Sequence, residues 1–243
     1  AAHRFDDHPN LPFVAVHRAV ALAGLGRHDE AMRELLAARA LTERRASPEH
    51  ALAELDDAIT RVALAHGDLD RALAAARRLL AARQAASEPA PGPLAFAELR
   101  VADALRAAGE LSAAAPLAEQ ALARFLDSPL RHYFLMIAEL RLGLGELLLA
   151  QRRPADALVQ FETGHRDLAT TSEPHNPTLA RLAFAAARAL QTQGLADERP
   201  RAQALARDAL AALLRAAPGY AREAAAVAAF LRENFAESPG GPN

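Results

Sequence analysis

The sequence predicts an all-α fold, a solenoid of five helical hairpins followed by a C-terminal capping helix. Two observations predict it. Ala, Leu, Arg and Glu, which favour helices, fill long stretches of the 243 residues, and β-branched residues are scarce. A turn residue followed by Ala recurs along the chain, with successive turns 41, 42, 43 and 42 residues apart. A constant period in this range is typical of stacked hairpins, each of which buries its apolar face against its neighbours.

Each copy of the repeat is marked by its turn residue and by the Ala that follows it. In four copies the Ala lies five positions after the turn: Gly26 and Ala31, Gly67 and Ala72, Gly109 and Ala114, Arg152 and Ala157. The fifth copy, Gly194 and Ala202, contains three additional residues. We therefore expect five equivalent hairpin turns, the last of them irregular.

Prolines mark the starts of the hairpins, because proline is tolerated in the first turn of a helix and not in its interior. Ser47-Pro48 and Ser128-Pro129 are typical of an N-cap followed by Pro at the first helical position, and Pro154 starts a helix in the same way. We predict one array over residues 1–235 and a flexible tail at 236–243. The predicted hairpins are 11–44, 49–86, 94–126, 130–169 and 178–216, with the capping helix at 219–234.

Two further positions of the repeat are constrained. Seven residues before each turn lies a small residue: Ala19, Thr60, Ala102, Gly145 and Ala187. Four before each turn lies an apolar residue, large in four copies: Leu22, Ala63, Leu105, Leu148 and Leu190. Together with the Ala after the turn, this pattern resembles the tetratricopeptide repeat (TPR) over roughly residues 9–217. The resemblance implies a right-handed α-solenoid, in which the small residue lets two helices approach and the large residue fills the seam.

The repeat length narrows the resemblance. Most tetratricopeptide repeats have about 34 residues, whereas this period resembles the longer variety found in kinesin light chains. Residues 7–11 and 174–180 are similar to the linkers of that variety. The stretch from Leu182 to Arg232 resembles the repeats that follow bacterial serine/threonine kinase domains, and similar repeats occur in bacterial transcriptional activators with ATPase modules.

Composition excludes several classes of function. The net charge is −2 and all 28 basic residues are Arg, so no global basic field would attract nucleic acid or an anionic membrane. The longest apolar run, 224–231, has eight residues, far short of the roughly 20 that span a bilayer. With no Cys there are no disulfides or thiolate metal sites, and we expect a cytoplasmic protein. The first ten residues contain neither Met nor a signal-peptide pattern, so we expect a segment of a longer protein.

No motif supports catalysis or a cofactor. The segment 165–168 reads His-Arg-Asp-Leu, as in a kinase catalytic loop, but Ser172 occupies the place of the metal-binding Asn. Its place in the repeat predicts an exposed end of a second hairpin helix. The glycines of 24–26 and 143–145 do not complete a GxGxxG motif, and the nine His form no HExxH pair. We therefore predict no catalytic residue, no cofactor and no metal ion.

The resemblance implies a binding groove lined by the first helix of each hairpin. Its candidate residues lie six, ten and thirteen positions before the turns. They are Phe13, Val16, Val20, Asp57, Arg61, Phe96, Leu99, Asp103, Glu139, Glu146, Arg181, Phe184 and Arg188. On one hypothesis, aromatic side chains anchor a peptide or partner helix and the charges fix its register. On the other, the charged residues only pair across repeats, where each exposed pair contributes about 0–1 kcal/mol.

The sequence thus predicts a non-catalytic protein-interaction module, with a protein or peptide as its ligand, within a larger bacterial signalling protein. One alternative is the regulatory or substrate-recruiting C-terminal arm of a serine/threonine kinase. Others are the sensor arm of an ATPase-type transcriptional regulator and a self-associating scaffold whose end helices stack on another copy. Neither nucleic acid nor membrane is an expected partner.

Overall fold

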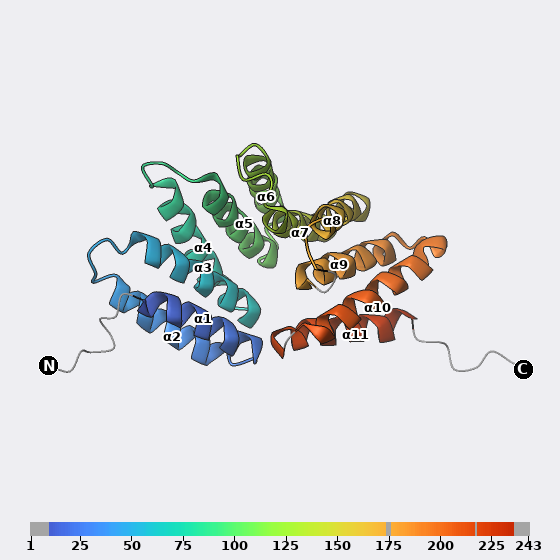
Figure 1. Ribbon diagram of the computed structural model, residues 1–243, viewed down its shortest axis with the longest axis horizontal. Coiled ribbons are helices and arrows are strands. Elements are labelled where there is room, and N and C mark those ends of the chain that lie inside the picture. The colour runs from blue at the N-terminus through green and yellow to red at the C-terminus, as the bar shows by residue number, and fades with distance from the viewer. Residues whose placement is uncertain (1–9, 174–175, 217, 236–243) are drawn as a thin grey trace, which may run out of the picture. The chain divides into compact units, whose positions relative to one another are not determined.

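The computed structural model describes residues 10–173, 176–216 and 218–235, and within them it contains eleven α-helices and no strand (Figure 1). The predicted tail at 236–243 lies outside the described residues. Short 3₁₀ segments precede α10 and α11, at Ala196–Glu198 and Pro218–Tyr220. The helices are α1 (Leu11–Gly24), α2 (His28–Thr42), α3 (Glu49–His66), α4 (Leu69–Gln84), α5 (Pro91–Ala107), α6 (Leu111–Leu126), α7 (Phe134–Ala150), α8 (Pro154–Ala169), α9 (Pro177–Gln193), α10 (Arg199–Arg215) and α11 (Ala221–Phe235).

The helices pack as the predicted hairpins. By their internal contacts, the residues form two compact units. Unit 1 (residues 1–131) contains α1–α6, and unit 2 (residues 132–243) contains α7–α11. Within unit 1 each helix from α1 to α6 packs against the next, and within unit 2 each helix from α7 to α11 packs against the next. The single array over residues 1–235 stays a prediction.

All five predicted turn residues adopt the left-handed conformation that ends a helix. The φ angles are 78° at Gly26, 85° at Gly67, 82° at Gly109 and 71° at Gly194. Arg152 takes the same conformation with φ 61°, although a side chain is disfavoured there. The sequence repeat therefore corresponds to a repeat in backbone geometry, and Arg152 occupies the turn position of the fourth copy.

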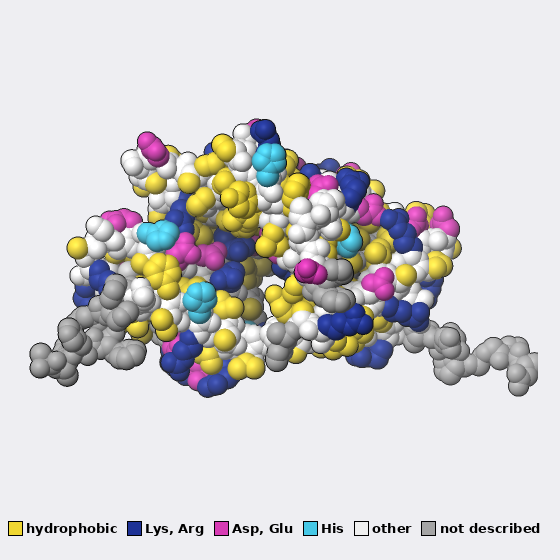
Figure 2. All heavy atoms as spheres, viewed as in Figure 1, with side chains coloured by type: hydrophobic (Ala, Val, Ile, Leu, Met, Phe, Trp, Pro, Cys, Tyr) yellow, Lys and Arg dark blue, Asp and Glu magenta, His cyan; other side chains and the backbone are white. Residues whose placement is uncertain are grey.

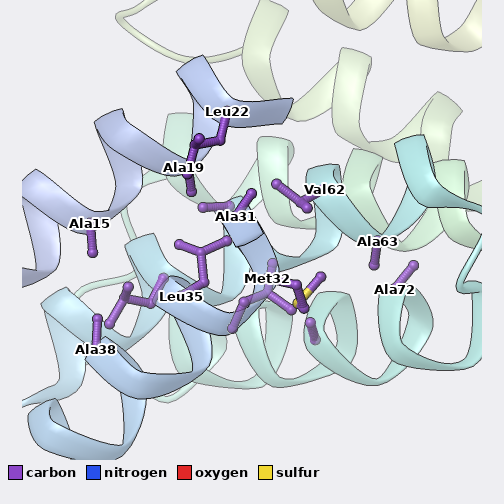
Figure 3. Close-up of a cluster of buried hydrophobic side chains, with 14 of the residues drawn as sticks. Ala15, Ala19, Leu22, Ala31, Met32, Leu35, Ala38, Val62, Ala63 and Ala72 are labelled. Carbon is purple, nitrogen blue, oxygen red and sulfur yellow. The ribbon is translucent and has the colours of Figure 1, made fainter. Parts of the chain in front are cut away.

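The small and large repeat positions form the seams between helices, as predicted. In unit 1, Ala19, Leu22 and Ala31 are buried in one cluster with Ala63 and Ala72 (Figure 3). In unit 2, Ala187, Leu190 and Ala202 belong to an equivalent cluster. The three additional residues of the fifth copy are accommodated in the 3₁₀ turn Ala196–Glu198, which leaves Ala202 fully buried. Close packing at these positions holds the helices of each unit together.

Both predicted Ser N-caps are wrong, although α3 begins at Glu49 as predicted. At 47–48, Pro48 itself is the N-cap of α3 and no side chain caps the helix. At 128–129, the Ser128 hydroxyl donates to the Phe125 carbonyl and accepts from the Leu130 amide, so it closes α6. Helix α7 begins only at Phe134. A Ser-Pro pair therefore closed a turn here, because the hydroxyl and the backbone amide of Ser128 both reach the Phe125 carbonyl at the end of the preceding helix. The start of α8 at Pro154 is confirmed.

Candidate functional site

In unit 1, the apolar candidates on α1 are accessible. Phe13 is 41% exposed and Val20 is 43% exposed, whereas Val16 packs partly against the core. The Phe13 ring lies 6.3 Å from the His50 ring of α3, centroid to centroid. Helix α1 therefore presents an apolar strip beside the start of α3.

The candidates on α5 have structural partners. Phe96 packs edge-on against the buried ring of Phe125 on α6, with 6.3 Å between centroids. Leu99 is only 3% exposed, so it belongs to the core and offers no surface to a ligand. The sequence placed Phe96 and Leu99 together as an apolar patch, but neighbouring helices cover much of that patch.

The charged candidates of unit 1 are joined by Arg100, a residue that sequence reasoning missed. Its Nε donates to Asp57 of α3 at 2.7 Å, and its Nη1 lies 3.6 Å from Asp103. Arg61 pairs with Asp57 at 3.1 Å, one turn away on α3. Acidic and basic side chains accordingly lie next to one another over α3 and α5 (Figure 2). The sequence could have indicated Arg100, since it directly follows the candidate groove residue Leu99.

In unit 2, the charged candidates form pairs between α7 and α9. Arg181 donates to Glu139 at 2.8 Å, and Thr178 donates to the same carboxylate at 2.9 Å. Seven residues further along each of the two helices, Arg188 donates to Glu146 at 2.7 Å. Each ion pair joins equivalent positions of successive repeats. These four charged residues therefore pair across repeats, as the second hypothesis for the groove charges describes.

A hollow of about 270 Å³ opens beside these pairs. Three of the candidate groove residues line it, Glu146 from α7 and Arg181 and Phe184 from α9, together with Leu142, which lies ten positions before the turn at Arg152. Phe184 packs edge-on against Phe230 of α11, with 5.3 Å between centroids, and the guanidinium of Arg188 lies 5.9 Å from the Phe184 ring. These contacts fix the orientation of Phe184, so the wall of the hollow is preorganised.

Helices α10 and α11 complete the hollow with three residues that the sequence did not indicate. Leu213 of α10 is buried, while Glu223 and Ala226 of α11 are exposed and line the opening. Sequence reasoning treated α11 as a cap only. The hydrogen bond from Gln191 to Asn234 and the contact of Phe184 with Phe230 instead seat α11 beside α9. Helix α11 thus extends the face formed by α7 and α9.

A second hollow, of about 490 Å³, lies in unit 1 among α2, α3 and α4. Its polar centre is Asp56, which is buried and accepts from Arg39 at 3.1 Å and from Arg78 at 2.7 Å. A similar buried acid, Glu98, accepts from Arg124 at 2.9 Å. Because each buried carboxylate is bonded to arginine of an adjacent helix, removing either partner would leave an uncompensated charge in unit 1.

The kinase-like segment 165–168 lies in the last turn of α8, as its place in the repeat predicted. Leu168 is buried and His165 is half-buried, so only part of this helix end is exposed. Burial lowers the pKa of His165, which favours the neutral imidazole. Residues 10–173, 176–216 and 218–235 contain no group of three or more His, Cys, Asp or Glu arranged to hold a metal ion.

No helix in the described part of the chain is long and apolar enough to cross a membrane. The candidate surfaces described above are helix faces within each unit. Unit 1 offers an apolar strip on α1 and a group of charged side chains in which Arg100 contacts Asp57 and Asp103. Unit 2 offers a preorganised hollow with apolar walls and charged edges.

No protein-family model matches the sequence, and no curated protein matches it. Solved structures do resemble it. The nearly identical TPR-like repeats of a Podosopora anserina protein described as a kinesin light chain match 85% of this chain and 96% of their own, with 21% identity and a TM-score of 0.59. PlcR of Bacillus thuringiensis, solved with the peptide PapR7 and DNA, matches 93% of this chain and 74% of its own, with 14% identity and a TM-score of 0.67.

A third similar structure is the Rap conjugation gene regulator of plasmid pLS20, solved with the Phr* peptide. It matches over 92% of this chain and 63% of its own, with 14% identity and a TM-score of 0.65. At these identities the likeness concerns the fold. Together with the five left-handed turns and the buried small residues, it shows that the chain has the fold of tetratricopeptide-like repeats.

Proposed function

We propose that this chain is a non-catalytic binding module that holds a peptide or a helix of a partner protein. The observation that carries the proposal is the hollow of unit 2, because it combines apolar walls with charged edges and lies where the sequence predicted a groove. Two of the similar structures, PlcR and the pLS20 Rap regulator, were solved with bound peptides, which supports the same kind of ligand here.

Preorganisation also favours binding. Phe184 is fixed by Phe230, and the ion pairs Arg181–Glu139 and Arg188–Glu146 hold the charged edges in place. A wall that is already ordered costs a ligand little conformational entropy on binding. The 490 Å³ hollow of unit 1, by contrast, has Asp56 at its centre, and that carboxylate is already bonded to Arg39 and Arg78. We therefore assign the ligand to unit 2.

The test uses the purified chain and a phage-displayed library of random short peptides. Selected peptides are synthesised with a fluorophore, and their dissociation constants are measured by fluorescence anisotropy. The key variant is Ala226→Phe, which fills the opening from an exposed position without removing a contact. We expect it to weaken binding about tenfold or more, since it excludes the ligand's anchoring side chain.

The matched control is Ala225→Phe, the neighbouring exposed alanine of α11, which does not line the hollow. It adds the same apolar surface to the same helix, and we expect the affinity to stay within about twofold of the original. Failure to select any peptide that binds better than its scrambled sequence would refute the proposed function. Equal binding by both variants would refute the assignment of the ligand to this hollow.

The wider context is proposed on the sequence resemblance alone. A module of this kind would serve as the partner-recruiting part of a larger signalling protein, with the chemistry performed elsewhere. The kinase-like segment 165–168 contributes nothing to such chemistry, because it lies at the end of α8 with Leu168 in the core.

A further inference from the structure

The charges around the hollow of unit 2 are not equally available to a ligand. Arg181 is bonded to Glu139, and Glu146 is bonded to Arg188. An acidic ligand would therefore have to compete with a carboxylate already bound to each of these arginines. Within the described part of the chain, Glu223 has no hydrogen bond or ion pair, although it lines the opening. Its carboxylate is the charge that a ligand meets without breaking an existing pair.

The net charge around the hollow also indicates that Glu223 is the charge available to a ligand. The two ion pairs are neutral as units, and Glu223 leaves a net charge of −1 at the hollow. Since α11 is exposed at this position, the Glu223 carboxylate is solvated. A cationic group brought to it would gain Coulomb energy with little desolvation, the arrangement typical of charges at the rim of an interface.

The interior of the hollow has the opposite character. Leu142 and Leu213 are 6% and 2% exposed and form apolar surface together with Phe184 and Ala226. No buried acceptor in this wall would be left unsatisfied by an aliphatic or aromatic side chain, so an apolar anchor suits it. An apolar interior beside an unpaired acid favours a ligand that carries an apolar side chain and, close to it, a basic side chain.

We propose that the hollow of unit 2 selects peptide segments in which an apolar side chain is followed or preceded closely by Lys or Arg. The apolar side chain enters between Leu142, Phe184 and Leu213, and the basic side chain bonds to Glu223. This inference rests on the proposed function, which it makes specific by naming the chemistry of the ligand.

The test begins with the peptides selected from the random library. We expect them to share an apolar residue with a neighbouring Lys or Arg, and to bind more weakly as salt is raised, because an exposed ion pair is screened. Glu223→Arg should weaken their binding about tenfold or more, through loss of the pair and repulsion of the basic side chain. The same selection repeated on Glu223→Arg should yield peptides with Asp or Glu at that place.

The matched control is Glu233→Arg, another exposed acid of α11 that does not line the hollow. It changes the net charge equally, and we expect it to leave affinity within about twofold. Peptides that lose binding in Ala226→Phe but not in Glu223→Arg would overturn the proposed ligand chemistry and leave the binding function standing. A selected pool rich in acidic residues would overturn it as well. Absence of any binding peptide would instead refute the function itself.

Discussion

Units 1 and 2 share one repeat frame but use their charges differently. Eleven residues before the turn, unit 1 has the buried acids Asp56 and Glu98, each bonded to arginines of adjacent helices. Unit 2 has Arg141 at the equivalent position, where it donates to Gln160, and then Ala183. Burial lowers the pKa of Arg141, the opposite of what a bonded carboxylate would do.

In unit 2 the strong ion pairs lie along the face of α7 and α9 instead of inside the hairpins. The comparison teaches that a repeat fold fixes the apolar seams and leaves the polar positions free to serve either stability or recognition. In unit 1 they serve stability, because the acids are buried. In unit 2 the paired side chains are partly exposed and border the hollow of α7, α9 and α11. Substitutions of polar residues should therefore affect folding in unit 1 and binding in unit 2.

The largest effect is expected where both units obey the same rule, at the apolar seam. Leu148→Asp places a carboxylate at a seam position that is 5% exposed and has no partner for the charge. We expect a loss of about 4 kcal/mol or more in the free energy of unfolding, measured with urea. Hydrogen exchange should show the loss of protection in α7 and α8. Leu214→Asp, at an exposed leucine of α10, should change stability by no more than about 0.5 kcal/mol. A cooperative transition left unchanged by Leu148→Asp would refute the repeat register.

The next effect tests the role of buried acids in unit 1. Asp56→Ala leaves Arg39 and Arg78 without the carboxylate that they share, and we expect it to cost about 3 kcal/mol. Its neighbour Asp57 is half-buried and bonded to Arg100 and Arg61, so Asp57→Ala should cost less than about 1 kcal/mol. Thermal and urea unfolding measure the loss of unfolding free energy in both variants. Equal losses would mean that the burial of Asp56 does not make its ion pairs more important for stability than those of Asp57.

A smaller effect is expected at Gly145 of α7, where a buried aromatic ring leaves no room for a side chain. A Cβ added at Gly145 would lie 2.2 Å from Cε1 of Phe161, a fully buried ring. Gly145→Ala should therefore destabilise the protein by about 1–3 kcal/mol, although Ala is the better helix former. The double variant with Phe161→Leu should recover part of that loss. A stabilising Gly145→Ala would show that the ring shifts freely, and the seam of unit 2 would then be less well packed than described.

The smallest effect concerns the turns, which are glycine throughout unit 1 but include Arg152 in unit 2. Arg152→Gly relieves a left-handed side-chain conformation, and we expect a gain of about 0.5–1 kcal/mol in unfolding free energy. Arg153→Gly is the control, because that residue has φ −111° and should gain nothing. Differential scanning calorimetry can resolve the two. A loss in stability at Arg152→Gly would mean that the Arg152 side chain makes a contact worth more than the strain.

The sequence by itself determined the hairpins, their turns and their seams. The turn residues and the small residues seven positions before them obey rules that act within a few residues or between adjacent helices, so periodicity reveals them. The sequence pattern was less able to predict where helices start. Ser128 could cap a following helix or close a preceding one, and only the position of the Phe125 carbonyl decided between them.

Only the tertiary structure decided which groove positions are available. Leu99 and Val16 occupy the same repeat position, yet Leu99 is buried and Val16 is half-exposed, because α1 is covered on fewer sides than α5. Glu223 and Ala226 lie on α11, beyond the last repeat, where no period indicates which face meets the hollow. Exposure and pairing depend on helices that are distant in sequence, and a local pattern carries no information about their approach.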